Sequence, residues 1–577
     1  MPDFKKLLTN LFFFHEPEQS ENFVLEETDK EKSQEKPGAG KSEAKADSGA
    51  KEKKSFNGGE KTYTNDISEN LSENLDHIKH VYNIPVNGDL ILREFDIVVK
   101  DRVIPAFIVF IDGMTDRKVI NDDILQPLML LSNLDIKSKD ANIADYIRNH
   151  ILPHNQLKEY KEHKKIIEEV NFGGCGIYVD GINSAFGADV KGWEHRPVGE
   201  PSTELVIRGP HEGFTEQLRV NTALIRKILK DEDLIAENVT VGRRSRTACA
   251  LLYIKDITNN SLVDEVRRRL KGIKTDYLID SGELEQYLED STYLPTPQII
   301  ATERPDRVAS LLSDGMVAVV MHGSPFVLVM PATLPDLFHS SEDAYLRFPF
   351  GNFLRLVRLI GMIFALVLPG IYVAITNYHQ EMLPTDLLFS IEAAREKVPF
   401  PSIVEILIME FSFELIREAG IRIPGAIGPT LGIIGALILG QAAVAANIVS
   451  PILIIVVAVT GLGSFSIPNF SLAIAFRILR FAFIALGALA GFLGISAGLF
   501  VYVLLLVDAK SFGVPFLAPL GPRTAGAMDD ALARTPIWKQ ERRPDFLNTK
   551  DDTKQADISR SWAWKKPEKP KDDKGGD

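Results

Sequence analysis

The sequence predicts a soluble N-terminal domain of mixed α/β (α+β) fold with two lobes, followed by an α-helical polytopic membrane domain. Residues 71–347 intermix amphipathic helical stretches with short apolar runs bounded by turn residues, which is typical of helices packed on sheets. Residues 352–520 contain apolar runs of about 20 residues with few charges, and such a run can cross a bilayer as a helix. The chain has 577 residues, which is too long for one ordinary domain.

The first part of the chain divides into two segments. In residues 1–15 the large apolar residues recur at helical spacing, which predicts an amphipathic segment that docks on protein or on a membrane surface. These residues are Phe4, Leu7, Leu8, Leu11 and Phe12. The apolar run is too short for a signal peptide and lacks a small-residue cleavage site. Residues 16–70 are rich in Glu, Lys, Ser, Gly and Ala, so we expect a disordered charged tether.

The soluble region is predicted to form helices where apolar residues recur at helical spacing, at 71–84, 121–134, 215–229 and 261–273. Strands are predicted where β-branched and aromatic residues run together, at 90–99, 104–112 and 246–257, and in hairpins over 175–190 and 316–332. We place the division between the lobes near residue 232. This gives a first lobe of 71–231 and a second lobe of 232–347.

Several functional classes are disfavoured by composition and spacing. The formal net charge is −13, and no basic stripe with interleaved aromatic residues is present, so we expect no nucleic-acid partner. No His, Cys or Asp residues have metal-ligand spacing, and no nucleophile motif is found, so we predict no enzyme activity, no metal and no cofactor. Cys175 and Cys249 are expected to be buried free thiols, although a disulfide between them stays open.

The apolar region is predicted to contain four full membrane spans, at 354–376, 424–451, 452–467 and 481–507. A further apolar stretch at 399–420 is expected to be interfacial or re-entrant, with six crossings as the alternative. The tail, residues 521–577, is basic at its start and is expected to be disordered and cytoplasmic. With a cytoplasmic N-terminal domain, this arrangement requires an even number of crossings.

Five polar residues stand out within the apolar region. Glu405, Glu410 and Glu414 lie in the 399–420 stretch, and Gln441 and Asn447 lie in the 424–451 span. A charge at the bilayer centre costs roughly 2.5–3.5 kcal/mol on insertion scales, so this set cannot face lipid. The acids either lie at the interface or line a wet cavity, and each amide alone is equally well explained as a contact between helices. Taken together, the set predicts an ion path.

Long motifs in the chain resemble those of the A-subunit family of GerA-type spore germination receptors. The similar segments include EHRPVGEPSTELVIRGPHEGFTEQLRVNTALIRK at 194–227 and VGRRSRTACALLYI at 241–254. They also include the long stretch that contains ATERPDRVASLL, within 295–332, and REKVPFPSIVEILIMEFSFELIREAGIRIPGAIG at 395–428. The resemblance runs in unbroken order from about residue 75 to 525.

This resemblance implies a multi-pass protein of the spore inner membrane with both termini in the cytoplasm. It implies a homo-oligomeric, pentameric ring that forms a nutrient-gated cation channel, in a complex with a transporter-like B subunit and a lipoprotein C subunit. The charged motif positions carried over are Arg196, Glu200, Glu204, Arg208, Glu212, Glu303, Arg304 and Asp306. We interpret them as structural pairs that join lobe to lobe or subunit to subunit.

Two alternatives remain within this interpretation. The chain could be a non-conducting scaffold that assembles the receptor complex, or it could belong to a paralogous branch of stage V sporulation membrane proteins that shares the motifs. Neither the nutrient, the ion selectivity nor the number of subunits follows from the sequence.

Overall fold

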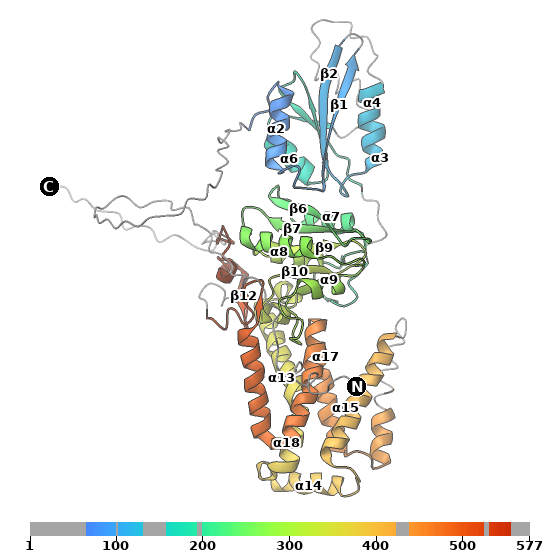
Figure 1. Ribbon diagram of the computed structural model, residues 1–577, viewed down its shortest axis with the longest axis vertical. Helices are drawn as coiled ribbons and strands as arrows, with labels where there is room; N and C mark the ends of the chain where they lie inside the picture. The colour runs from blue at the N-terminus through green and yellow to red at the C-terminus, as the bar shows by residue number, and fades with distance from the viewer. Residues whose placement is uncertain are drawn as a thin grey trace, which may run out of the picture.

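The computed structural model describes residues 65–99, 102–130, 157–192, 199–422, 435, 438–523 and 530–555. The predicted segment 1–15 and most of the predicted tether lie outside the described residues, as does the first part of the predicted span at 424–451. The described chain forms two lobes stacked along the long axis, with a bundle of helices beyond the second lobe (Figure 1).

The first lobe is a five-stranded sheet with antiparallel pairs in the order β1-β2-β4-β5-β3. The strands are β1 (Leu90–Val99), β2 (Arg102–Ile111), β3 (Leu157–Tyr160), β4 (Cys175–Val179) and β5 (Ala185–Ala188). Alternate residues of β2 point to opposite faces. Phe107 packs with Ile78 and Ile166 of α2 (Leu71–Val81) and α6 (His163–Asn171), while Ile108 packs with Ile124 on the other face. That second face is covered by α3 (Arg117–Val119), η1 (Ile120–Leu125) and α4 (Gln126–Leu130).

The second lobe repeats this plan with strands in the order β6-β7-β9-β10-β8. The strands are β6 (Leu234–Val241), β7 (Thr247–Ile254), β8 (Ile300–Thr302), β9 (Val317–Met321) and β10 (Val327–Met330). Helices α7 (Leu218–Ile228) and α10 (Pro305–Ser313) contribute to the core on one face. Helices α8 (Asn260–Gly272) and α9 (Ser281–Leu288) contribute to the core on the other face. Both faces are therefore buried.

The structure assigns helix α7 to the second lobe rather than to the first. Leu224 and Ile225 share a core with Leu252 of β7, whereas the division expected near residue 232 would leave this helix in the first lobe. An amphipathic pattern gives the buried face of a helix but not the sheet that it covers, which explains the difference. The two lobes are joined by a buried ion pair of Arg226 on α7 with Asp89 at the start of β1, at 2.7 Å.

The helical region consists of α13 (Phe348–Tyr378), α14 (Thr385–Arg395), α15 (Ser402–Arg422), α17 (Pro451–Phe465) and α18 (Phe470–Asp508), with a short η3 (Gln380–Met382). By length and composition, α13 and α18 are long and apolar enough to cross a bilayer, and α17 is a shorter apolar helix. The expected span at 354–376 falls within α13. The expected span at 481–507 is interrupted, because the backbone of α18 is non-helical at Ala490 and Gly491. The two arms of α18 turn back on each other there, and the rings of Phe476 and Tyr502 lie 6.4 Å apart between centroids. Helix α18 begins earlier, at Phe470, so Arg480 lies inside the helix rather than before it.

Helix α13 meets α17 and α18 through pairs of glycines. A Cβ atom added to Gly463 would lie 2.5 Å from the carbonyl oxygen of Gly361, and one added to Gly487 would lie 2.5 Å from that of Gly370. At both points the backbones therefore touch directly. Such close approach at small residues is typical of helices that associate within membranes.

The segment expected to continue as one span to residue 451 instead turns at Asn447. Residues 438–445 are helical. Asn447 then adopts φ of +56°, while its N–H donates to the carbonyl of Val444 and that of Ile448 donates to the carbonyl of Ala443. This pattern is a Schellman ending, for which asparagine is well suited. Ser450 caps the start of α17 by accepting the N–H of Leu453.

This turn yields a testable prediction for Asn447. Asn447→Ala should destabilise the helical region by about 1 kcal/mol, because a residue with a Cβ and no local polar group is strained at positive φ. Asn447→Gly should be close to neutral. Thermal unfolding of the detergent-purified protein measures both variants, and equal losses for Ala and Gly would show that the amide itself, rather than the backbone conformation, matters.

The chain that follows α18 returns to the second lobe. The hairpin of β11 (Lys510–Ser511) and β12 (Val514–Pro515) inserts Phe512 and Phe516 into the two cores of that lobe. Residues 530–555, with η5 (Ile537–Lys539) and η6 (Asp545–Leu547), then follow a defined path along the lobe. We expected disorder throughout 521–577, because this segment is charged and has few apolar residues. Its order in 530–555 comes instead from hydrogen bonds and ion pairs to the lobe and from the burial of Leu547 in the core of the lobe.

Candidate functional site

The motif that ends β8 and begins α10 holds the loop of residues 199–214 in place. Arg304 is 1% exposed, and its guanidinium donates to the carbonyls of Glu204 at 3.1 Å and Pro210 at 2.9 Å. The same group pairs with Asp306 at 2.9 Å. A planar guanidinium with several donors suits such a cluster of acceptors. Arg304 therefore connects the loop to the first turn of α10.

Two glutamates of the motif complete this contact. Glu204 accepts hydrogen bonds from the Thr302 hydroxyl and from Arg307. Glu303 accepts from the Ser202 hydroxyl at 3.2 Å and from the backbone N–H of Thr203 at 3.0 Å. Glu204, Glu303, Arg304 and Asp306 are thus brought together within the second lobe of one chain.

The other predicted motif residues lie apart from this cluster. Glu212 pairs with Lys227 at 2.5 Å, and Glu200 lies 3.5 Å from His211, both at the surface. Arg208 is exposed. Arg196 lies outside the described residues. For Arg208 and the surface pairs, a role between subunits stays a prediction.

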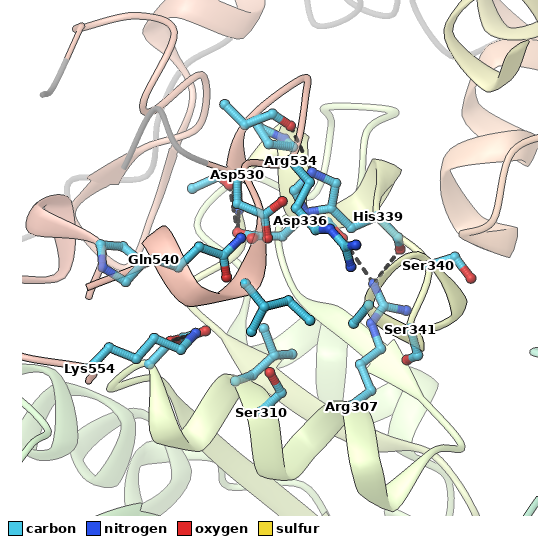
Figure 2. Close-up of a pocket in the computed structure, with 18 of the residues that line it drawn as sticks. Arg307, Ser310, Asp336, His339, Ser340, Ser341, Asp530, Arg534, Gln540 and Lys554 are labelled. Carbon is cyan, nitrogen blue, oxygen red and sulfur yellow. Dashed lines mark hydrogen bonds and ion pairs between the residues drawn. The ribbon is translucent and has the colours of Figure 1, made fainter. Parts of the chain in front are cut away.

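A cavity of about 400 Å³ separates α10 from the C-terminal segment (Figure 2), and Asp306 of the motif lies on its wall. The Tyr345 hydroxyl on its wall donates to Asp306. Burial, together with the adjacent Asp306 carboxylate, raises the pKa of Tyr345, so the hydroxyl keeps its proton. Tyr345 ends α12 (Glu342–Tyr345), which follows α11 (Leu334–Phe338) and precedes α13. The motif is therefore directly connected to the start of the helical region.

The joint between the second lobe and α13 is built around Asp343. This carboxylate is 1% exposed and pairs with Arg355 at 3.2 Å and Arg358 at 2.7 Å, both on α13. Arg355 also pairs with Asp530 at 2.7 Å. Both arginines therefore attach the helix to the lobe.

Glu405 is buried at the turn between the helices. Its carboxylate accepts the backbone N–H of Ser450 at 3.1 Å and lies 3.5 Å from the guanidinium of Arg395. It is 1% exposed. In this position Glu405 fixes the beginning of α17 relative to α15.

Glu410 and Glu414 on α15 lie against Arg480 of α18. Arg480 has no exposed surface and lies 3.1 Å from Glu410, which is equally buried, and 2.9 Å from Glu414. Arg417 also donates to Glu414 at 2.8 Å, and Arg477 lies 3.8 Å from it. Two acids and three arginines therefore form one charged network inside the apolar region. Charges buried in this way are stable only when they are paired.

The two predicted amides lie elsewhere. Gln441 and Asn447 are both exposed on the surface of the chain, on the helix of residues 438–445 and at its turn. Five predicted residues thus occupy three places: a buried turn contact, a charged network and an exposed face. Within the described ranges, no group of His, Cys, Asp or Glu residues is arranged to hold a metal ion. Cys175 and Cys249 are buried free thiols, and burial raises the pKa of Cys249 to about 12.

Comparison with known proteins agrees with the motifs. A family model described as Bacillus/Clostridium GerA spore germination protein matches residues 76–546. This chain belongs to the GerA family. Spore germination protein KA of Bacillus subtilis (strain 168) is 39% identical over 494 residues, which cover 86% of this chain and 90% of that protein. Spore germination protein GerLA of Bacillus cereus is 36% identical over 488 residues, which cover 85% and 98%.

A solved structure of the N-terminal domain of the A subunit of the Bacillus megaterium spore germinant receptor GerK3 is 32% identical. It covers 47% of this chain and 97% of its own, with a TM-score of 0.37. The resemblance to the A subunits of GerA-type receptors is confirmed by the family match and by relatives of nearly full length. The GerA family is one of germinant receptor subunits and is not known as a family of enzymes.

The partners of the acids in this GerA-family chain were not predicted from the sequence. Arg480 is the central cation of the charged network, and Arg534 and Asp343 hold the joint with α13. One signal was present: Arg477 and Arg480 interrupt an apolar run just as Glu410 and Glu414 interrupt another. Opposite charges in two apolar segments indicate a pair between helices.

Proposed function

We propose that this chain is a subunit of a nutrient-gated germinant receptor, and that several copies enclose a cation path across the spore inner membrane. The observation that carries the proposal is the exposed face at residues 438–448. Gln441 and Asn447 are exposed there, while Ala443 of the same segment shares a core with Val373 of α13 and Ile484 of α18. Within a bilayer a polar amide cannot face lipid, so this face requires water or another protein chain.

The charged network supports the same proposal from inside the chain. Glu405 and Glu410 are buried, so in this arrangement only Glu414, Gln441 and Asn447 could reach a path between chains. We infer that Glu405 and Glu410 position the helices, while the amides form the polar wall of the path. The cation path would lie on the axis of a homo-oligomer, for which we propose a pentamer.

The position of the helix ends supports a topology with an even number of crossings. The start of α13 and the chain after α18 both attach to the second lobe, so both ends lie on one side of the membrane. Because α18 turns back at Ala490 and Gly491, each of its two arms counts as a separate crossing. We therefore propose six crossings, with α15 as one of them and both termini cytoplasmic. A transporter-like B subunit and a lipoprotein C subunit are the partners that we propose for the complex.

Gln441→Leu tests the proposed path. Replacing this exposed amide by an apolar side chain should lower nutrient-triggered cation release from spores at least about tenfold, because an apolar constriction loses water. The amount of protein in the membrane should not change, since Gln441 makes little contact within the chain. Leu439→Met, on another side of the same helix, is the matched control. Release at the parental rate from Gln441→Leu would reject Gln441 as part of the path.

The rival function is a scaffold that assembles the receptor without conducting. The pairing of Glu410 and Glu414 with Arg480 favours it, because paired carboxylates offer no free site to a cation. Reconstitution of the complete receptor in liposomes separates the two functions. Cation flux on addition of nutrient supports the path, and an assembled receptor without flux supports the scaffold.

A further inference from the structure

Residues 530–555, here called the strap, connect two parts of the molecule that are separate in sequence. The strap begins beside α12 and α13 and ends on the second lobe, on the side of α8 and α10. In Figure 1 it lies alongside the second lobe, above α18. Each end makes its own set of contacts.

The far end of the strap binds the second lobe. Arg543 is 9% exposed, and its Nε donates to the carbonyl of Ser313 at 2.8 Å. The N–H of Lys550 donates to the carbonyl of Ile257 at 2.9 Å. Lys554 lies 2.6 Å from Asp314, and Leu547 is buried in the core of the lobe. The partners lie on α10 and in the segments that follow α10 and β7, so this end of the strap is attached to the second lobe.

The near end of the strap binds the joint of α12 and α13. The backbone N–H of Arg534 donates to the side chain of Asn352 at 2.8 Å, and the Asn352 amide returns a bond to the Arg534 carbonyl at 3.0 Å. The Arg534 guanidinium donates to the carbonyls of Asp343 and Leu346. These acceptors surround the carboxylate that holds Arg355 and Arg358. The strap therefore completes the attachment of α13.

Between its two ends the strap does not pack tightly against the lobe. The cavity of about 400 Å³ lies there, with Asp530, Arg534, Gln540 and Lys554 on the strap side (Figure 2). Arg307, Ser310 and Asp336 lie on the lobe side. A segment that is fixed at both ends over a cavity connects the two parts of the molecule that it binds. We call this connecting role a tie.

We propose that the strap couples the second lobe to helix α13, so that a displacement of the lobe is transmitted to the first long apolar helix. The role as a tie follows from the contacts alone, and the role in signalling rests on the proposed function. In that function the strap makes lobe and helix respond together to nutrient. Loosening the lobe end should therefore loosen the distant joint at 342–352.

Hydrogen exchange on the full-length protein in detergent tests the tie. Arg543→Ala should make amides of both 543–555 and 342–352 exchange about tenfold faster, because it removes several buried bonds at one end only. Lys554→Glu should act in the same direction, and Asp314→Lys added to it should restore slow exchange. Lys539→Ala is the matched control, since this side chain lies over Trp538 within the strap itself.

The possible outcomes test the coupling by the strap and the proposed cation channel separately. Faster exchange confined to 543–555, with 342–352 unchanged, would overturn the coupling. Failure of Asp314→Lys to rescue Lys554→Glu would also count against it. In spores, Arg543→Ala should slow nutrient-triggered cation release at an unchanged amount of receptor. If the parental receptor releases no cations, the proposed function fails, while the exchange experiment still decides the role of the strap.

Discussion

Replacing Arg480 by leucine is expected to destabilise the helical region by about 3–5 kcal/mol, because it leaves the buried Glu410 carboxylate without its cation and removes one partner of Glu414. Among the described residues, no other cation lies as close to Glu410, and both it and Arg480 are completely buried. The expected result is a protein that fails to accumulate in the membrane or that unfolds at a much lower temperature in detergent. Membrane levels and thermal unfolding of the purified protein measure this effect.

The pairing can be separated from a general intolerance of the site. The double variant Arg480→Leu with Glu410→Leu should recover much of the loss, since apolar pairs often replace buried ion pairs at little cost. Arg477→Leu is the matched control, because Arg477 lies 3.8 Å from Glu414 and is partly exposed. If Arg480→Leu is no worse than Arg477→Leu, the network does not stabilise the helical region.

Arg304→Ala is expected to destabilise the second lobe by about 3–5 kcal/mol, the usual cost of breaking a buried ion pair. The substitution removes the donor to the carbonyls of Glu204 and Pro210 and leaves Asp306 with the Tyr345 hydroxyl. The loop of residues 199–214 should then detach from α10. Arg304→Lys should rescue little, because an ammonium cannot reproduce the planar fork.

Limited proteolysis and thermal unfolding of the full-length protein measure the change, with cleavage expected within 199–214. Arg208→Ala is the matched control, since Arg208 lies in the same loop and is exposed. Wild-type resistance to cleavage in Arg304→Ala would show that the loop is held by other contacts.

The fold class of the soluble domain was predicted from the sequence because helices and strands bury opposite patterns of side chains. Ile108 and Phe107 alternate between two faces, and such alternation is visible without a structure. The assignment of α7 to the second lobe was not predictable in this way, since both sheets offer a similar apolar face. The short strand β3 was missed because its four residues, LKEY, are half polar.

The candidate site was only partly accessible to sequence analysis. Glu405, Glu410 and Glu414 were singled out because acids are costly in an apolar helix. Their partners were not, because the expected start of the last span placed Arg480 outside it. Asn447 was interpreted through its side chain, whereas the structure uses its tolerance of positive φ. Backbone conformation leaves little trace in hydropathy. The order of the strap likewise depends on individual hydrogen bonds, ion pairs and the buried Leu547 rather than on a repeating pattern.

The glycine contacts of α13 have a mechanical consequence. Where Gly361 meets Gly463 and Gly370 meets Gly487, the backbones are in contact, so a larger residue at Gly463 or Gly487 would push the helices apart. Arg480, by contrast, fixes the offset of α18 against α15 through two carboxylates. The distance of α13 from its neighbours is thus set by backbone contact at glycines, whereas the position of α18 along α15 is set by charge.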